Sequence, residues 1–313
     1  MKPRISVVSP VYKAEKILPE LVKRINAAVS KITDSFEIIL VEDGGPDNSW
    51  QVLQQLCIVH KHIKAIKLSR NFGQHYAITA GIDHAKGDWV VVMDCDLQDQ
   101  PEEIEKLYSE ALKGYDLVFA RRANRRDTFF KKFTSRMFYK MFSYLSGMEQ
   151  DGSISNFGIY SSKAIKAVNS MREPMRAFSP MIRWVGFSKT AVDVEHASRY
   201  EGTSSYNWSR LIELAIDISL AYSDKPLRLT VKLGFMMAFL AAACSIVMVI
   251  LYFAGQVKET GYTSLIFSIW FLSGLIIFTL GILGLYVGKI FDGIKGRPLY
   301  FIDTIINEHN GVD

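Results

Sequence analysis

Asp94, Asp96 and Gln98 are the residues whose types and spacing point most directly to chemistry. They follow the apolar run from Trp89 to Met93, which is short and rich in valine, a pattern typical of a buried strand. If extended backbone continues past Met93, the three oxygen-bearing side chains point to one side, because side chains alternate along a strand. They would then gather at the carboxyl end of a central strand, where open α/β sheets bind ligands.

Clustered carboxylate and amide oxygens suit a hard divalent cation. Mg²⁺ and Mn²⁺ prefer such ligands and usually share their coordination with substrate phosphates. The alternative is a solvated strand-to-helix turn, in which Asp acts as a turn former and Pro101 opens the next helix. Because the cluster directly follows a run of buried-type residues, we favour a metal site with Asp94, Asp96 and Gln98 as ligands.

A basic segment follows the predicted strand Asp116–Ala120. Its cations are Arg121, Arg122, Arg125, Arg126, Lys131 and Lys132. Guanidinium groups bind phosphate oxygens in a bidentate manner, so a loop that holds a diphosphate or a lipid phosphate is one interpretation. A solvated basic face is the other. We expect Arg121 and Arg122 to hold phosphate oxygens, since they lie closest to the strand end.

Strands and helices alternate through the first two hundred residues. The predicted strands are Ile5–Ser9, which we expect to end at Pro10, and Phe36–Val41, Ile63–Leu68, Trp89–Met93 and Asp116–Ala120. Helical patterns follow Ile17, Trp50 (with Ser49 as N-cap), His75 and Pro101. This alternation predicts an α/β fold with a Rossmann-like, mostly parallel sheet. Neither a G-x-G-x-x-G nor a G-x-x-x-x-G-K-[ST] motif is present, which argues against a dinucleotide oxidoreductase or a P-loop NTPase.

Two uncharged segments near the carboxyl end predict a membrane hairpin. Leu233–Phe253 and Leu265–Val287 each contain roughly 20 residues, the length that crosses a bilayer. The alternative is a pair of buried core helices. Cations flank the outer ends of the two segments (Lys225, Arg228 and Lys232; Lys289, Lys295 and Arg297), whereas the short link carries only Lys258. The positive-inside rule then places both termini and the large amino-terminal domain in the cytoplasm, on an inner (plasma) membrane protein.

These patterns define four predicted regions. They are a cytoplasmic catalytic domain (1–207), an amphipathic juxtamembrane helix (208–228), a transmembrane hairpin (229–288, with spans at about 231–253 and 265–287) and a cytoplasmic tail (289–313). The net charge of +5 suits an anionic membrane surface and phosphate-bearing substrates rather than nucleic acid. The three cysteines have no metal-binding or redox spacing.

Several segments together resemble glycosyltransferase family two, with the GT-A fold. Within it they are similar to the polyprenyl-phosphate glycosyltransferases, such as the dolichyl-phosphate mannose synthases and the bactoprenol glucosyltransferases. The resemblance rests on Val8–Tyr12 with Glu15, Val41–Asp47, Leu68–Gly73, Asp94–Asp99 with Pro101-Glu102, Asp151–Ser153, Arg199–Tyr206 and Gly296–Tyr300. It therefore covers nearly the whole chain.

The resemblance implies an inverting transfer of one sugar from a nucleotide-sugar, expected to be a UDP-sugar, to undecaprenyl phosphate. The product would be a lipid-linked sugar donor for modification of cell-envelope glycans. The implied catalytic residues are Asp96, Asp151 and Arg199. The implied donor-binding residues are Pro10, Tyr12, Glu15, Asp43, Arg70, Asp94, Arg121, Arg122 and Ser205. Mg²⁺ or Mn²⁺ is the implied cofactor, and the lipid bilayer and a possible second copy of the chain are the implied partners.

Two other functions stay open at this point. A processive polysaccharide synthase typically carries Q-x-x-R-W, and the nearest match here, Pro180–Trp184, lacks the Gln. Two spans would also form a poor polymer channel. A non-catalytic membrane scaffold that binds a nucleotide-sugar is the other alternative, although no structural need explains three clustered oxygen ligands.

Overall fold

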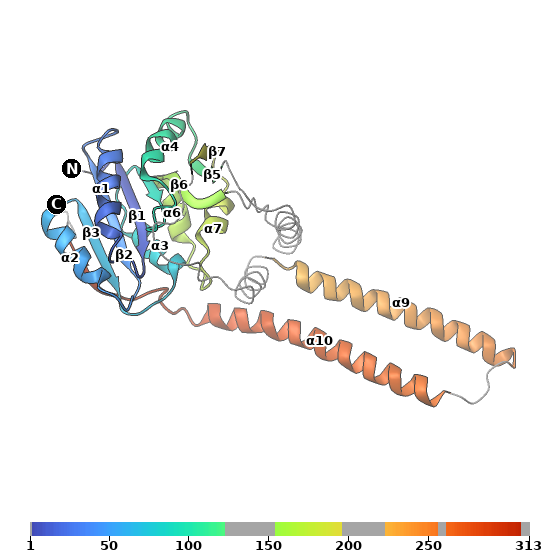
Figure 1. The fold of residues 1–313 in the computed structure, drawn as a ribbon. Helices are drawn as coiled ribbons and strands as arrows, with labels where there is room; N and C mark the ends of the chain where they lie inside the picture. Colours follow the sequence, from blue (N-terminus) through green and yellow to red (C-terminus); the bar gives the residue numbers. More distant parts are fainter. Residues whose placement is uncertain (1, 123–153, 196–222, 256–260, 308–313) are drawn as a thin grey trace. The chain divides into compact units, whose positions relative to one another are not determined.

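The computed structural model describes residues 2–122, 154–195, 223–255 and 261–307 (Figure 1). The described residues fall into two compact units. The first contains residues 2–122, 154–195 and 297–307, and the second contains residues 223–255 and 261–296. The chain therefore leaves the first unit, passes through the second, and returns to the first.

The first unit is built on an eight-stranded sheet with the strand order β7-β5-β6-β4-β1-β2-β3-β8. Neighbours from β4 through β3 are parallel, as are β5 and β7, whereas β6 and β8 are antiparallel to their partners. This mixed, mainly parallel sheet confirms the predicted fold class. The strands are β1 (Ile5–Val11), β2 (Phe36–Glu42), β3 (Ile63–Leu68), β4 (Trp89–Val92), β5 (Leu117–Arg122), β6 (Ile154–Ser161), β7 (Lys189–Val194) and β8 (Ile302–Ile306).

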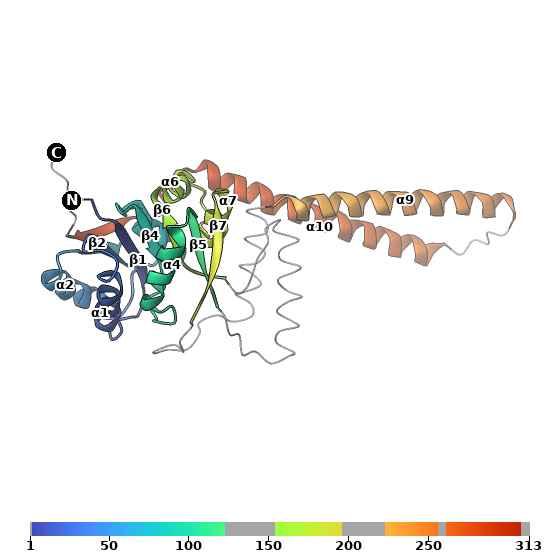
Figure 2. The same cartoon turned by 90° about the horizontal axis from the view of Figure 1, so that it is seen from above.

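Helices cover both faces of the sheet (Figure 2). One face packs against α1 (Leu18–Val29), α2 (Ser49–Val59) and α4 (Ile104–Ala111), which follows the 3₁₀ turn η1 (Pro101–Glu103). The other carries α3 (Gln74–Asp83), α6 (Ser162–Ser170) and α7 (Phe178–Trp184). Because apolar helix faces cover it from both sides, every residue of β1 is buried. Strands of a parallel sheet are usually buried on both faces, and their sequences are therefore mainly apolar.

Strand β1 continues one residue past Pro10, where we had expected it to end. The ladder with β2 runs to Val11, but the ladder with β4 stops at Val8. The carbonyl of Val8 accepts from the N–H of Met93 on the β4 side, so the nitrogen two residues on, at Pro10, faces the same side. Proline lacks an N–H there, but β4 has already ended, and no ladder bond is lost.

Ser49 does not have the predicted role of N-cap. Helix α2 begins at Ser49 itself, with Asn48 at the N-cap position. The Ser49 hydroxyl instead donates to the Asp47 carboxylate at 2.8 Å and accepts from the N–H of Ala14 at 3.0 Å. It therefore joins the loop after β2 to the loop after β1.

The second unit contains two long helices, α9 (Lys225–Phe253) and α10 (Tyr262–Ile294). They include the two predicted spans. By length and composition, one helix in the described part of the chain, Ser268–Ile294, is apolar enough to cross a membrane, and its most apolar stretch is not buried within the protein. Most of the predicted juxtamembrane helix lies outside the described residues, and its last residues form the first turn of α9.

The segment after α10 completes the sheet. Strand β8 pairs antiparallel with β3, and the N–H of Ser69 donates to the carbonyl of Phe301 at 2.9 Å. The side-chain amide of Asn307 then donates to the carbonyls of Cys57 and Ile63 at 2.9 and 3.0 Å. Part of the predicted carboxyl-terminal tail is thus a strand of the same sheet that carries the candidate site.

Candidate active site

The acidic segment after β4 forms a turn rather than an extended strand. Strand β4 ends at Val92, and Leu97 has a φ of 57°, in the left-handed region that non-glycine residues rarely adopt. This conformation buries the Leu97 side chain, which is 2% exposed. The N–H of Gln98 donates to Asp96 Oδ1 at 3.1 Å, which closes the turn. The strand alternation that we used to align Asp94, Asp96 and Gln98 therefore does not apply, and their role as metal ligands stays a prediction.

Asp94 is fixed by a neighbouring loop. Its Oδ1 accepts a hydrogen bond from the side-chain amide of Gln74 at 2.6 Å. Next to it, burial and the adjacent Asp94 charge raise the pKa of the Cys95 thiol to about 12. This shift disfavours the thiolate, which is the reactive form of cysteine.

Asp43, at the end of β2, is almost completely buried, with 3% of its surface exposed. Its two carboxylate oxygens accept from the N–H groups of Phe72 and Gly73 at 2.7 and 2.8 Å. Burial raises the pKa of Asp43, and these two hydrogen bonds oppose that shift. A carboxylate can accept about four hydrogen bonds, so these two do not exhaust the capacity of Asp43. The expected contact with the base of a nucleotide stays a prediction.

Glycine is required where the loops after β2 and β3 meet. Gly44 has a φ of 61°, and a Cβ at this position would lie 2.4 Å from the backbone nitrogen of Asn71. The two loops are therefore in direct backbone contact. Arg70, on the second loop, is exposed; its guanidinium lies 4.0 Å from the ring centroid of Phe72 and donates to the carbonyl of Asn71 at 3.0 Å.

The end of β1 and the loop after it contain three further predicted donor-binding residues. Pro10 is buried in the strand, whereas the Tyr12 ring is 45% exposed, with the ammonium of Lys13 5.4 Å from its centroid. The Glu15 carboxylate accepts from the N–H of Asn48 at 2.9 Å. Tyr12 is thus available for stacking, and Glu15 joins the loops after β1 and β2.

The predicted phosphate-binding arginines begin at the end of β5. The Arg121 guanidinium donates to the Asp193 carboxylate of β7 at 2.5 Å, and this bond lowers the pKa of Asp193. Both side chains are about half exposed. Arg122 is the last residue of β5. Other residues with predicted or considered roles lie outside the described part of the chain: Arg125, Arg126, Asp151, Arg199 and Ser205.

The model of one protein family, described as "Glycosyl transferase family 2", matches residues 6–168, which include all the described loops around Asp43 and Asp94. The chain belongs to this family. An undecaprenyl-phosphate 4-deoxy-4-formamido-L-arabinose transferase from Photorhabdus laumondii is 35% identical over 316 residues, covering 99% of this chain and 96% of that protein. An uncharacterized glycosyltransferase of Bacillus subtilis, YkcC, is 33% identical over 298 residues, covering 95% and 92%.

Solved structures confirm the fold of this glycosyltransferase. The glucosyl-3-phosphoglycerate synthase of Mycobacterium tuberculosis, crystallised with Mn²⁺, UDP and phosphoglyceric acid, superposes with a TM-score of 0.51. The match covers 70% of this chain and 77% of that chain at 16% sequence identity. At that identity the likeness concerns the fold alone.

The potential metal ligands of this glycosyltransferase suit a divalent ion that is held partly by its substrate. Within the described residues, no group of three or more His, Cys, Asp or Glu side chains could hold a metal ion alone. The acidic turn nevertheless offers hard oxygen ligands from Asp94, Asp96 and Gln98. Mg²⁺ and Mn²⁺ usually take one or two carboxylates and complete their coordination with substrate phosphates and water. The residues present suit that arrangement.

The sequence did not predict the part played by Gln74. It is the first residue of α3, directly after Gly73, whose φ of 106° sets the start of the helix. The loop that ends at Gln74 brings together Asp43 from β2 and Asp94 from β4, which the sequence predicted separately. The sequence signal that could have identified Gln74 is a polar residue at the beginning of a helix that follows a strand.

Proposed function

We propose that this glycosyltransferase transfers a single sugar, with inversion, from a UDP-sugar to undecaprenyl phosphate. One observation carries the proposal. Relatives named as undecaprenyl-phosphate sugar transferases, 35% and 36% identical, align with 99% and 97% of the chain. At this coverage, nearly all of α9, α10 and β8 lies within the aligned residues. The likeness therefore includes the helices that would bring a protein to a lipid substrate.

The reaction chemistry agrees with the residues present. The acceptor is a phosphate monoester, whose second pKa is about 6, so it is largely a dianion at neutral pH and needs little help from a base. The leaving nucleoside diphosphate carries the growing charge. A bound Mg²⁺ or Mn²⁺ would neutralise that charge, and we propose that Asp96 and Gln98 hold the ion, with Asp94 as a further ligand or as a ribose contact.

Each remaining group has a proposed role. Asp43 reads the nucleotide base from its buried position, and Tyr12 offers an exposed ring beside it on the neighbouring strand end. Arg121, Arg122, Arg199 and Ser205 hold phosphate oxygens of donor or acceptor. Arg121 would exchange its half-exposed partner Asp193 for phosphate, which costs little because exposed ion pairs contribute little to stability. Asp151 orients the acceptor or the sugar.

We propose that both α9 and α10 cross the membrane. Strands β3 and β8 are neighbours in one sheet, so the chain before α9 and the chain after α10 belong to the same folded unit. A folded unit lies on one side of a bilayer, and the intervening chain must then cross an even number of times. Two helices of 29 and 33 residues, flanked at their outer ends by cations, suit one crossing each. The acceptor phosphate would then lie at headgroup level, on the cytoplasmic side.

A donor panel tests the reaction. The purified protein is incubated with undecaprenyl phosphate, Mg²⁺ or Mn²⁺ and a series of nucleotide-sugars, and the lipid product is weighed by mass spectrometry. We expect a product that carries one sugar. A ladder of longer products would support a processive synthase instead, and donor binding without any product would support a scaffold.

Cysteine labelling tests the topology. In a background without the natural cysteines, a cysteine in place of Thr260 should react with an impermeant reagent added to intact cells. A cysteine in place of Asn310 should react only after the membrane is opened. Labelling of the second variant in intact cells would contradict an even number of crossings.

A further inference from the structure

We propose that Gln74 is a positioning residue of the donor site: its side-chain amide fixes the Asp94 carboxylate while leaving its negative charge in place. The inference rests on the proposed function, because it concerns how that site holds a nucleotide and its divalent ion. No predicted role had been given to Gln74.

The geometry places Gln74 between two acidic residues of the site. Its Nε2 lies 2.6 Å from Asp94 Oδ1, and both side chains are half-buried. The two residues before it, Phe72 and Gly73, donate their N–H groups to Asp43. Strands β2 and β4, after which Asp43 and Asp94 follow, lie on either side of β1. One short loop thus contacts two carboxylates that follow different strands.

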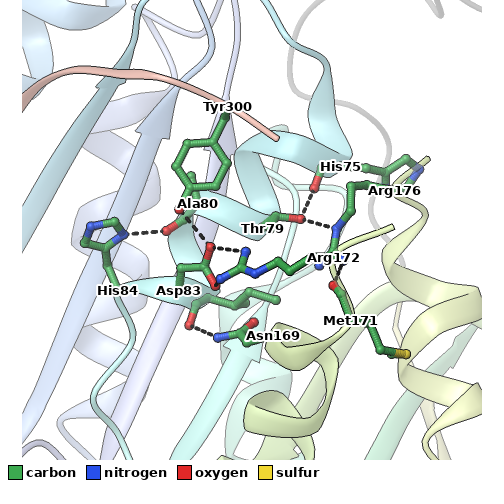
Figure 3. A network of polar contacts seen from close by, with 11 residues as sticks. His75, Thr79, Ala80, Asp83, His84, Asn169, Met171, Arg172, Arg176 and Tyr300 are labelled. Atoms are coloured by element: carbon green, nitrogen blue, oxygen red, sulfur yellow. Dashed lines mark hydrogen bonds and ion pairs between the residues drawn. The ribbon is translucent and has the colours of Figure 1, made fainter. Parts of the chain in front are cut away.

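The helix that begins at Gln74 is held by hydrogen bonds of residues further along it (Figure 3). Thr79 accepts from the buried guanidinium of Arg176 at 3.1 Å, and Asp83 accepts two hydrogen bonds from Arg172. The hydroxyl of Tyr300 donates to Asp83 as well, at 2.8 Å. These contacts fix the helix whose first residue is Gln74 against the neighbouring segments.

The chemical type of the donor matters as much as its position. Lysine or arginine would also bind a carboxylate, but each would bring a positive charge that competes with a divalent cation. A side-chain amide donates without a charge. Asp94 can then be oriented by Gln74 and still attract Mg²⁺ or Mn²⁺, or accept a hydrogen bond from a ribose hydroxyl.

Three variants of one position separate orientation from charge. Gln74→Leu removes the donor at similar volume, Gln74→Asn keeps an amide on a shorter side chain, and Gln74→Lys supplies a charged donor. Gln55→Leu is the matched control, because Gln55 is exposed on α2. The readouts are the affinity for Mn²⁺ in the presence of UDP, measured by calorimetry, together with the melting temperature and the KM values for donor and acceptor.

We expect Gln74→Leu to weaken Mn²⁺–UDP binding about tenfold, the equivalent of one hydrogen bond to a charged group. Gln74→Asn should lose less, and Gln74→Lys should lose about a hundredfold, since it adds a competing charge. The acceptor KM and the behaviour of Gln55→Leu should be unchanged. Wild-type affinity in Gln74→Leu, or tighter Mn²⁺ binding by Gln74→Lys than by Gln74→Leu, would overturn the inference.

The binding readout keeps this inference separate from the proposed function. If the wild-type protein binds Mn²⁺ and UDP but transfers no sugar to undecaprenyl phosphate, the proposed reaction fails while the effect of Gln74 can still be measured. If the wild-type protein transfers sugar and the Gln74 variants bind Mn²⁺–UDP as it does, the role of Gln74 fails alone.

Discussion

Helix α3 has carboxylates at both of its ends, and different kinds of donor hold them. At the amino-terminal end, Asp43 and Asp94 accept from two backbone N–H groups and from the amide of Gln74, all of which are uncharged. At the carboxyl-terminal end, Asp83 accepts two hydrogen bonds from the guanidinium of Arg172, at 2.8 and 3.0 Å (Figure 3).

Under the proposed function, the difference separates two carboxylates that bind a ligand from one that stabilises the fold. An arginine paired in a bidentate manner cancels the charge of Asp83 and leaves it structural. The backbone N–H groups that bind Asp43 and the Gln74 amide that binds Asp94 carry no charge, although burial raises the pKa of Asp43 and the nearby Arg70 guanidinium opposes that shift. A carboxylate that is fixed but still negative is what a divalent ion or a nucleotide hydroxyl requires, so the kind of donor indicates the role of the acid.

The largest effect is expected at the amino-terminal end of α3. Asp94→Ala should lower turnover on the order of a hundredfold, the loss typical of one preorganised electrostatic group. Asp96→Ala and chelation of the unmutated protein with EDTA should have similar effects. The melting temperature should change little, because the side chain is only half-buried. Product formation and thermal unfolding measure the two quantities, and Glu105→Ala, at an exposed acid of α4, is the control.

Asp83→Ala should have the opposite pattern. The Asp83 side chain is 11% exposed. Its removal leaves Arg172 and Tyr300 without their acceptor. We expect the free energy of unfolding to fall by about 2 kcal/mol, in the range for hydrogen bonds to charged groups, with nearly normal KM values in the folded protein. Asp88→Ala removes an exposed ion pair with Lys2 and should cost less than about 1 kcal/mol. A fall in turnover as large as that of Asp94→Ala would break the comparison.

His75, in the first turn of α3, should make stability depend on pH. Burial and the nearby Arg176 lower the pKa of His75 from 6.5 to about 4. The folded protein then keeps the imidazole neutral, whereas the unfolded chain binds a proton below pH 6.5. The free energy of unfolding should therefore fall as the pH drops from 6.5 toward 4, by up to about 1.4 kcal/mol per pH unit from this group.

His75→Asn tests this dependence, because an Asn oxygen can replace Nδ1 as the acceptor of the Phe178 N–H. The variant should lose less stability on acidification than the wild-type protein. Unfolding curves recorded at several pH values give the two slopes. Parallel slopes would mean that His75 is not the acid-sensitive group of this helix.

The smallest effect is expected from Tyr300→Phe. It removes one hydroxyl from Asp83 and keeps the ring, so it should cost about 1 kcal/mol. Burial and the Asp83 carboxylate raise the pKa of Tyr300, which keeps the hydroxyl protonated as a donor. Tyr115→Phe is the matched control, since the described residues give the Tyr115 hydroxyl no hydrogen bond. Equal melting temperatures for both variants would show that Arg172 alone satisfies Asp83.

Apolar periodicity predicted the first five strands and the helices among them, because each has one consistent pattern along its length. Strands β6, β7 and β8 were not predicted. Strand β7 lies at an edge of the sheet, and most of its residues are only half-buried. Strand β8 is short and follows a membrane-type helix, where a tail was the simpler interpretation. Edge strands carry weak patterns, since only part of each is buried.

The sequence predicted individual residues of the candidate site but not the turn and the hydrogen bonds that position them. Asp94 and Asp96 were recognisable because they follow an apolar strand, and Asp43 because its segment resembles the corresponding segment of the family. The turn that begins after Met93 was not, since the left-handed conformation of Leu97 depends on a core contact far from it in sequence. The amide of Gln74 was missed for the same reason: 20 residues separate it from the carboxylate that it binds.

The pairing of β8 with β3 has a consequence for the synthesis of this protein. While the ribosome makes residues 69 to 301, the edge of β3 has no partner on that side. An unpaired edge can join a strand of another chain. The last strand of the catalytic sheet emerges only after both long helices have been translated. We therefore expect the sheet to be completed only after both helices have been made, so that truncation before Ile302 leaves a catalytic unit prone to aggregation.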